Sequence, residues 1–115
     1  MAFFPQELDS DLENKIWDTA ILVSVESLRA GINTVIDSMA LTKSFRRRII
    51  SGVESMSKIQ FYLTAIFLDT PLNVAFERNS KREKKVLEST IKSLYAFLES
   101  PSEEEGFREI IKIVP

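Results

Sequence analysis

Apolar residues recur at alternating spacings of four and three in the N-terminal part of the chain, and this pattern constrains the fold most. The series consists of Ile21, Val25, Leu28, Ile32, Val35 and Met39. This spacing places all its members on one face of an α-helix. Only three glycines and four prolines interrupt the 115 residues, and no long stretch alternates with the period of two that is typical of a strand. We therefore expect a long amphipathic helix here and helices elsewhere in the chain.

The same spacing, continued to the C-terminus, predicts an N-terminal arm and four helices. The arm covers residues 1–8, and the helices cover about 9–39, 43–69, 71–99 and 102–113. Pro71 and Pro101 separate the last three, because proline disfavours helix for the residue before it. Ser102 and Glu105 have the spacing of a capping box. The predicted fold is all-α: one domain over residues 1–115, an antiparallel bundle of three long helices and a short C-terminal helix.

Two points in this scheme stay open. A helix over 9–39 would be about 45 Å long at 1.5 Å per residue, whereas a compact domain of this length is about 34 Å across. The helix must therefore bend, with Gly31 as one place for the bend, or project, or the bundle is elongated. In the third helix, apolar residues stay in phase throughout and favour continuity, while Ser80 and Glu83 form a capping-box pattern that favours a restart near residue 80.

The composition gives no sign of catalytic chemistry. The chain has no cysteine and no histidine, which removes thiolate and imidazole metal ligands and the side chain that usually titrates near neutral pH. Two Ser-x-x-Lys matches, at Ser55 and Ser89, lie inside predicted helices and lack the companion motifs of the β-lactamase-like enzymes. The acids of the run 103–105 point in different directions on a helix. We expect no enzyme, no catalytic residue, no cofactor and no metal site.

The hydropathy of the chain gives no membrane segment either. The longest apolar-rich run, 59–68, is half the length that a helical span needs, which is about 20 residues. The first residues lack the basic region and the long apolar region of a signal peptide. We therefore expect no membrane span and a cytoplasmic location.

Three apolar residues have no place in the predicted core. Phe3 and Phe4 belong to the arm, and Leu22 shares a helix face with Asp18 and Glu26. Packing of the two phenylalanines over the end of the bundle is the simpler alternative to a partner. With the over-long first helix, these residues predict a non-enzymatic helical protein–protein interaction module. It would form a homo-oligomer or be a small subunit of a larger assembly with another protein partner.

Nucleic-acid binding is the alternative function. If the helices over 43–69 and 71–99 form an antiparallel hairpin, basic residues line up along one side of it. These are Arg46, Arg47, Arg48, Lys58, Lys81, Arg82 and Lys85. Such a strip could neutralise phosphates. Glu54 and Glu88 interrupt it, the net charge is −2, and no aromatic residue is interleaved to stack on bases.

Overall fold

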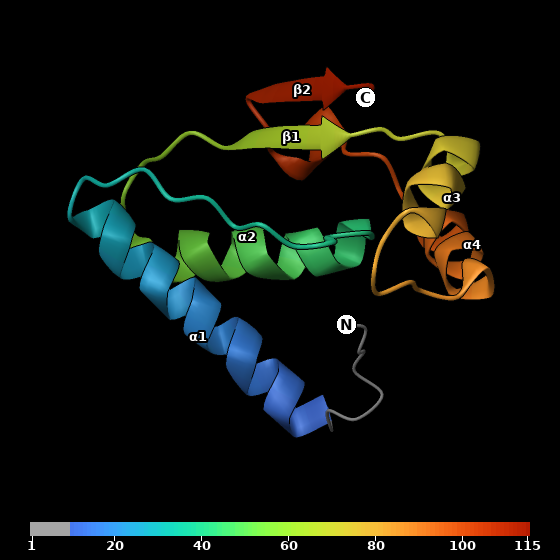
Figure 1. Cartoon of the computed structure of the whole chain (residues 1–115). Coiled ribbons are helices and arrows are strands. Elements are labelled where there is room, and N and C mark those ends of the chain that lie inside the picture. Colours follow the sequence, from blue (N-terminus) through green and yellow to red (C-terminus); the bar gives the residue numbers. More distant parts are fainter. Residues whose placement is uncertain (1–9) are drawn as a thin grey trace. The chain divides into compact units, whose positions relative to one another are not determined.

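The computed structural model describes residues 10–115 and shows a chain of mixed α/β structure (Figure 1). Its elements are α1 (Ser10–Arg29), α2 (Lys43–Ser57), β1 (Thr64–Leu68), α3 (Leu72–Ser80), α4 (Glu88–Phe97), the 3₁₀ helix η2 (Glu103–Glu105) and β2 (Glu109–Ile113). The prediction of an all-α antiparallel bundle is therefore wrong. In the described part of the chain, four α-helices accompany a two-stranded parallel sheet.

The chain folds into two compact units. The α1–α2 unit comprises the described residues 10–40 and 44–61, and the sheet unit comprises residues 41–43 and 62–115. Each unit is described by itself below. The expectation of a single domain stays a prediction, and the predicted arm lies outside the described residues.

The α1–α2 unit is built around a closed apolar core. Ile21 and Val25 of α1 and Ile49 and Val53 of α2 are buried together, because each pair is spaced by one helical turn. Four half-buried residues pack around this cluster: Trp17, Leu28, Phe45 and Phe61. The rings of Trp17 and Phe45 meet edge to face, with centroids 4.8 Å apart. The two helices therefore bury their apolar stripes against each other.

A glycine allows the close approach of these helices. A Cβ atom at Gly52 would lie 2.8 Å from Cδ1 and 3.1 Å from Cγ2 of Ile21. Real Cβ atoms almost never come that close to another heavy atom, so the Ile21 side chain occupies the space that any larger residue would need.

The first helix ends at Arg29 rather than near residue 39. Gly31 has a φ of 78°. Its N–H donates to the carbonyl of Leu28 at 3.0 Å, and the N–H of Ile32 donates to the carbonyl of Ser27 at 2.9 Å. This pair of bonds is a Schellman motif, which closes a helix. Gly31 therefore ends α1 instead of bending it, and the predicted apolar stripe joins the core only as far as Leu28.

The second predicted helix is also too long. α2 begins at Lys43 as expected but ends at Ser57, where Lys58 adopts a φ of 53°. Residues 64–68, which were expected to continue the helix, form β1 instead. Their sequence, Thr-Ala-Ile-Phe-Leu, is rich in residues that favour strands. A short apolar run of this kind fits a strand and a buried helix equally well.

The sheet unit is a parallel strand pair joined by a helical crossover. β1 and β2 pair from Thr64 opposite Glu109 to Leu68 opposite Ile113. Figure 1 shows the two arrows side by side and pointing the same way, with α3 and α4 between them in the chain. A crossover of this kind is needed because a tight turn can join only antiparallel strands.

The third predicted helix is divided. α3 ends at Ser80 and α4 begins at Glu88, so the structure has neither the continuous helix nor the restart near residue 80. The buried Asn79 explains the break. Its Nδ2 donates to the carbonyl of Val86 at 2.7 Å, and the N–H of Val86 donates to its Oδ1 at 3.0 Å. These two bonds clamp the ends of the intervening loop.

The predicted C-terminal helix is replaced by η2 and β2. The capping box of Ser102 and Glu105 does form, and the backbone N–H of Ser102 donates to Glu105 Oε2 at 2.8 Å. Gly106, with a φ of 104°, ends this short helix. The chain then continues as a strand through residues 109–113, whose three isoleucines are β-branched and suit a pleated surface.

Candidate interaction surface

The sheet carries an exposed apolar face. Ile66 lies opposite Ile111 in the strand register, and Leu68 lies opposite Ile113. Register partners and residues two apart in a strand point to the same side of a sheet. The exposed fractions of these four side chains are 62%, 39%, 63% and 44%, in that order. We call this set the outer sheet face. Neighbouring exposed apolar side chains of this kind are a candidate interaction surface.

The other side of the sheet is only partly covered. Ala65, Phe67 and Ile110 point to that side and are half-buried. No apolar residue between positions 62 and 115 is fully buried. Parallel sheets normally have both faces covered by other elements. The sheet unit, taken by itself, therefore lacks a closed apolar core.

Each strand also has an open edge, because the sheet has two strands. The carbonyl of Leu63 accepts from the N–H of Arg108 at 2.8 Å, and the N–H of Asp69 donates to the carbonyl of Ile113 at 2.8 Å. Backbone groups of alternate residues in a strand face opposite edges. The residues of β1 that face away from β2 are therefore Thr64, Ile66 and Leu68. We call their backbone groups the β1 edge.

The β1 edge lacks the usual protection against pairing. Proteins guard open edges with charged residues or proline. β2 contains Glu109 and Lys112, whereas β1 contains neither a charged residue nor a proline. The salt bridge between Lys112 Nζ and Asp69 Oδ2, at 3.0 Å, lies just beyond the C-terminal end of β1. The edge of β1 is therefore the more accessible of the two for another strand.

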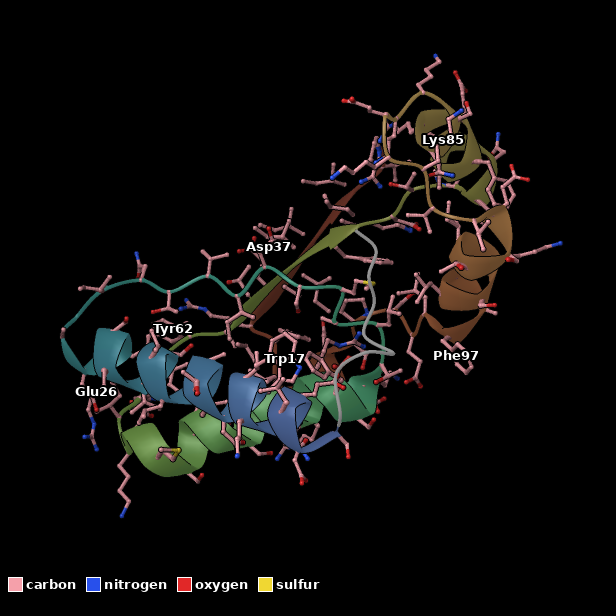
Figure 2. The ribbon with its side chains drawn as sticks, turned by 60° about the horizontal axis from the view of Figure 1, so that its bottom comes forward. Trp17, Glu26, Asp37, Tyr62, Lys85 and Phe97 are labelled. Carbon is pink, nitrogen blue, oxygen red and sulfur yellow. The ribbon has the colours of Figure 1, made fainter. Side chains whose placement is uncertain are left out.

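A second exposed apolar stretch belongs to the α1–α2 unit. Residues 32–39, which we call the linking segment, form neither helix nor strand. The exposed fractions are 59% for Ile32, 83% for Val35 and 57% for Met39. Among the described residues of the α1–α2 unit, residues 33–39 take part in no backbone–backbone hydrogen bond. Figure 2 shows Asp37 on this drawn-out trace between α1 and α2.

Both ends of the linking segment are fixed. The Schellman motif at Gly31 holds the N-terminal end. At the C-terminal end, Nη1 of the buried Arg46 donates to the carbonyl of Ala40 at 2.7 Å. Ordered structure thus holds the segment at both ends, while residues 33–39 form no backbone–backbone hydrogen bond with the described residues of the α1–α2 unit.

The structure describes one of the three predicted interface residues. Leu22 lies on α1 with 48% of its side chain exposed, and Phe3 and Phe4 lie outside the described residues. The outer sheet face and the linking segment were missed by sequence reasoning. The available signals were the absence of charge in residues 64–68 and the glycine at position 31.

The three adjacent arginines at positions 46–48, the arginine triplet, form hydrogen bonds and ion pairs within the α1–α2 unit. Arg46 is buried against the carbonyl of Ala40. Arg48 Nη2 lies 3.2 Å from Asp18 Oδ1, and Arg47 Nη1 lies 4.0 Å from Glu54 Oε1. Two of the predicted basic residues in the α1–α2 unit are exposed: Arg47 within α2 and Lys58 directly after its C-terminal end.

The remaining basic residues lie in the sheet unit. Lys81, Arg82 and Lys85 are exposed on the loop between α3 and α4, where Figure 2 labels Lys85. The helix hairpin that was expected to align them with the arginine triplet does not exist, because β1 occupies residues 64–68. Binding of nucleic acid by these residues stays a prediction.

Residues 10–115 contain no cluster of carboxylates that could hold a metal ion. No helix in this range is long and apolar enough to cross a membrane. Comparison with protein-family models finds no match to this chain, and a search of curated proteins finds none either. Function is therefore inferred from the surfaces described above.

Proposed function

We propose that this protein is a non-enzymatic interaction module that associates with another protein chain through its sheet unit, and that it self-associates. The observation that carries the proposal is the outer sheet face, in which four large aliphatic side chains lie exposed side by side. A small subunit of a larger assembly would present the same surface to a different protein.

The free energy gained by burying these side chains can be compared with the stability of a domain and with the cost of association. Full burial of one such side chain is worth about 1.5–3 kcal/mol, and the total stability of a domain is only about 5–15 kcal/mol. Covering the outer sheet face therefore changes the stability of the sheet unit substantially. Association itself costs about 4–15 kcal/mol in lost freedom. Contacts beyond these four side chains must contribute to a stable complex.

Light scattering coupled to size-exclusion chromatography, over a wide range of protein concentration, tests the proposal. We expect a mass that rises with concentration from monomer to dimer or beyond. The double substitution Ile66→Ser with Ile111→Ser should weaken this association at least about tenfold, or about 1.4 kcal/mol. A chain that stays monomeric throughout would contradict self-association.

A matched control separates this surface from apolar exposure in general. Ile16 and Val23 on α1 are also exposed, at 45% and 58%. Their double substitution by serine should leave the association unchanged. Leu22→Ser tests the interface residue that the sequence predicts. If the α1 variants weaken association and the sheet variants do not, the interface lies on α1 and the proposed site is wrong.

A second candidate is nucleic-acid binding by the α3–α4 loop. Residues 81–85 contain four exposed cations. Lys81 pairs with Glu77 at 3.2 Å, and the other three form no ion pair with any residue of the range 10–115. The Asn79 clamp fixes both ends of the loop. Binding to a labelled single strand or duplex should weaken steeply between about 50 and 200 mM salt. Lys84→Glu with Lys85→Glu should abolish it, and binding that ignores salt would exclude this candidate.

A further inference from the structure

We infer that the linking segment of one copy of this chain pairs, strand to strand, with the β1 edge of a second copy. The inference rests on the proposed function, because it specifies how two copies associate. It joins the backbone groups of residues 33–36 to those of the β1 edge, each of which lacks a backbone partner within the described residues of its own unit.

The donor strand is the first part of the linking segment. Residues 32–36 read Ile-Asn-Thr-Val-Ile, so four of the five are β-branched. Such residues favour extended backbone. The stretch contains no charge, and a bend at Ser38 follows shortly after it. It is therefore a strand-forming sequence of five residues. Residues 33–36 form no backbone–backbone hydrogen bond within the described residues of the α1–α2 unit, whereas the N–H of Ile32 already donates to the carbonyl of Ser27.

The acceptor is the edge of a strand of equal length. β1 also has five residues and no charge, so pairing would bury no unpaired ion, a burial that would be costly. A two-stranded pair is marginal in water, and a third strand makes a sheet markedly more stable. Strand addition of this kind supplies main-chain hydrogen bonds for affinity and side-chain contacts for specificity.

The side-chain pattern of the donor also fits. Because side chains alternate along a strand, Ile32, Thr34 and Ile36 would lie on one face of the added strand. Placed beside β1 on the same side as Ile66 and Leu68, they would extend the outer sheet face across a third strand. These apolar contacts would add to those of the four side chains of the outer sheet face, which are too few by themselves for a stable complex.

A second copy is the occupant because each copy has both a donor and an acceptor. Reciprocal exchange between two copies would pair both donors and both acceptors and close a symmetric dimer. A one-way exchange would leave one donor and one acceptor open and produce longer assemblies.

Disulfide trapping tests this arrangement directly, because the natural chain has no cysteine. One copy carries Thr34→Cys or Ile36→Cys, and a second copy, distinguished by mass, carries Ile66→Cys. After mixing and mild oxidation, mass spectrometry measures the fraction of disulfide between different copies. We expect efficient trapping for at least one donor position, since a disulfide requires Cβ atoms about 3.5–4.5 Å apart. Val23→Cys on the exposed side of α1 is the control and should not trap.

The outcomes separate the pairing from the proposed function. A dimer by light scattering with no trapping above the control at any donor position would overturn the strand pairing and leave self-association standing. A chain that stays monomeric would overturn both. If Thr34→Cys and Ile66→Cys in one chain close within that chain and never between copies, the segment pairs with its own sheet and the second copy is excluded.

Discussion

The α1–α2 unit and the sheet unit place the same kinds of side chain in opposite environments. In the former, Ile21 and Ile49 are buried in a closed cluster. In the latter, Ile66 and Ile111 face outward, and no apolar side chain of residues 62–115 is fully buried. Two helices can each bury one apolar stripe against the other. A sheet has two faces and two edges to cover, and two short helices are too few to cover them.

The buried polar groups show the same difference. The fully buried residues of the sheet unit are Asn79 and Glu105, each of which fixes a local turn by hydrogen bonds to nearby backbone. The conformation of the sheet unit is therefore set by local polar contacts, whereas that of the α1–α2 unit is set by its core. We therefore expect a partner to increase the stability of the sheet unit more than that of the α1–α2 unit.

The largest expected effect comes from truncating one isoleucine in each unit. Ile21→Ala should lower the free energy of unfolding by about 3 kcal/mol, because it leaves a cavity in a closed core. Ile66→Ala should change it by less than about 0.5 kcal/mol in dilute solution, since the side chain is exposed. Urea unfolding measures both. The cost of Ile66→Ala should grow as protein concentration rises, and equal costs for the two variants at all concentrations would remove the contrast between the units.

Two adjacent arginines give the next contrast. Arg46 is buried and bonded to the carbonyl of Ala40, so Arg46→Gln should cost about 1.5–3 kcal/mol. The neighbouring Arg47 is exposed, and its ion pair with Glu54 is long, at 4.0 Å. Arg47→Gln should cost no more than about 0.5 kcal/mol. Thermal unfolding of both variants checks the order, and the reverse order would mean that Arg46 does not anchor the start of α2.

Two asparagines of α3 test the polar framework of the sheet unit. Asn79→Ala removes both bonds to Val86 and should cost about 1–3 kcal/mol. Asn73 is exposed on the same helix, and Asn73→Ala should be neutral within about 0.5 kcal/mol. Hydrogen exchange at the Val86 amide should accelerate only in the Asn79 variant. Unchanged exchange there would show that the loop is held by other contacts.

The smallest expected effect is at the end of α1. Gly31 has a φ of 78° and open space around its Cα, so Gly31→Ala introduces backbone strain without a clash. The expected cost is about 1 kcal/mol. If alanine instead stabilises the protein, the helix continues past residue 31 as its apolar spacing predicts, and the linking segment is helical rather than available for pairing.

Local features of the fold could be predicted from the sequence. These features depend on residues that are close together in the chain. They are the starts of α1 and α2, the core residues Ile21 and Val25, and the capping box of Ser102 with Glu105. The strands could not be predicted, because β1 and β2 pair residues far apart in the sequence and each is too short for its spacing to exclude a helix.

The linking segment and the outer sheet face could not be predicted from the sequence for a similar reason. The apolar spacing of α1 continues through Gly31 to Met39, so the linking segment has the pattern of a buried helix face. The glycine is the stronger signal, because a helix commonly ends with a glycine in the left-handed conformation. Leu22 could be recognised as an apolar residue outside the core, but the outer sheet face appears only once the register of β1 and β2 is known.

Amide hydrogen exchange at low and high protein concentration tests most directly whether a second copy completes the sheet unit. The prediction is that protection at Thr64, Ile66 and Leu68, and in residues 32–36, rises with concentration, while protection of the α1–α2 core stays constant. Protection that is the same at both concentrations in β1 and in the linking segment would contradict it.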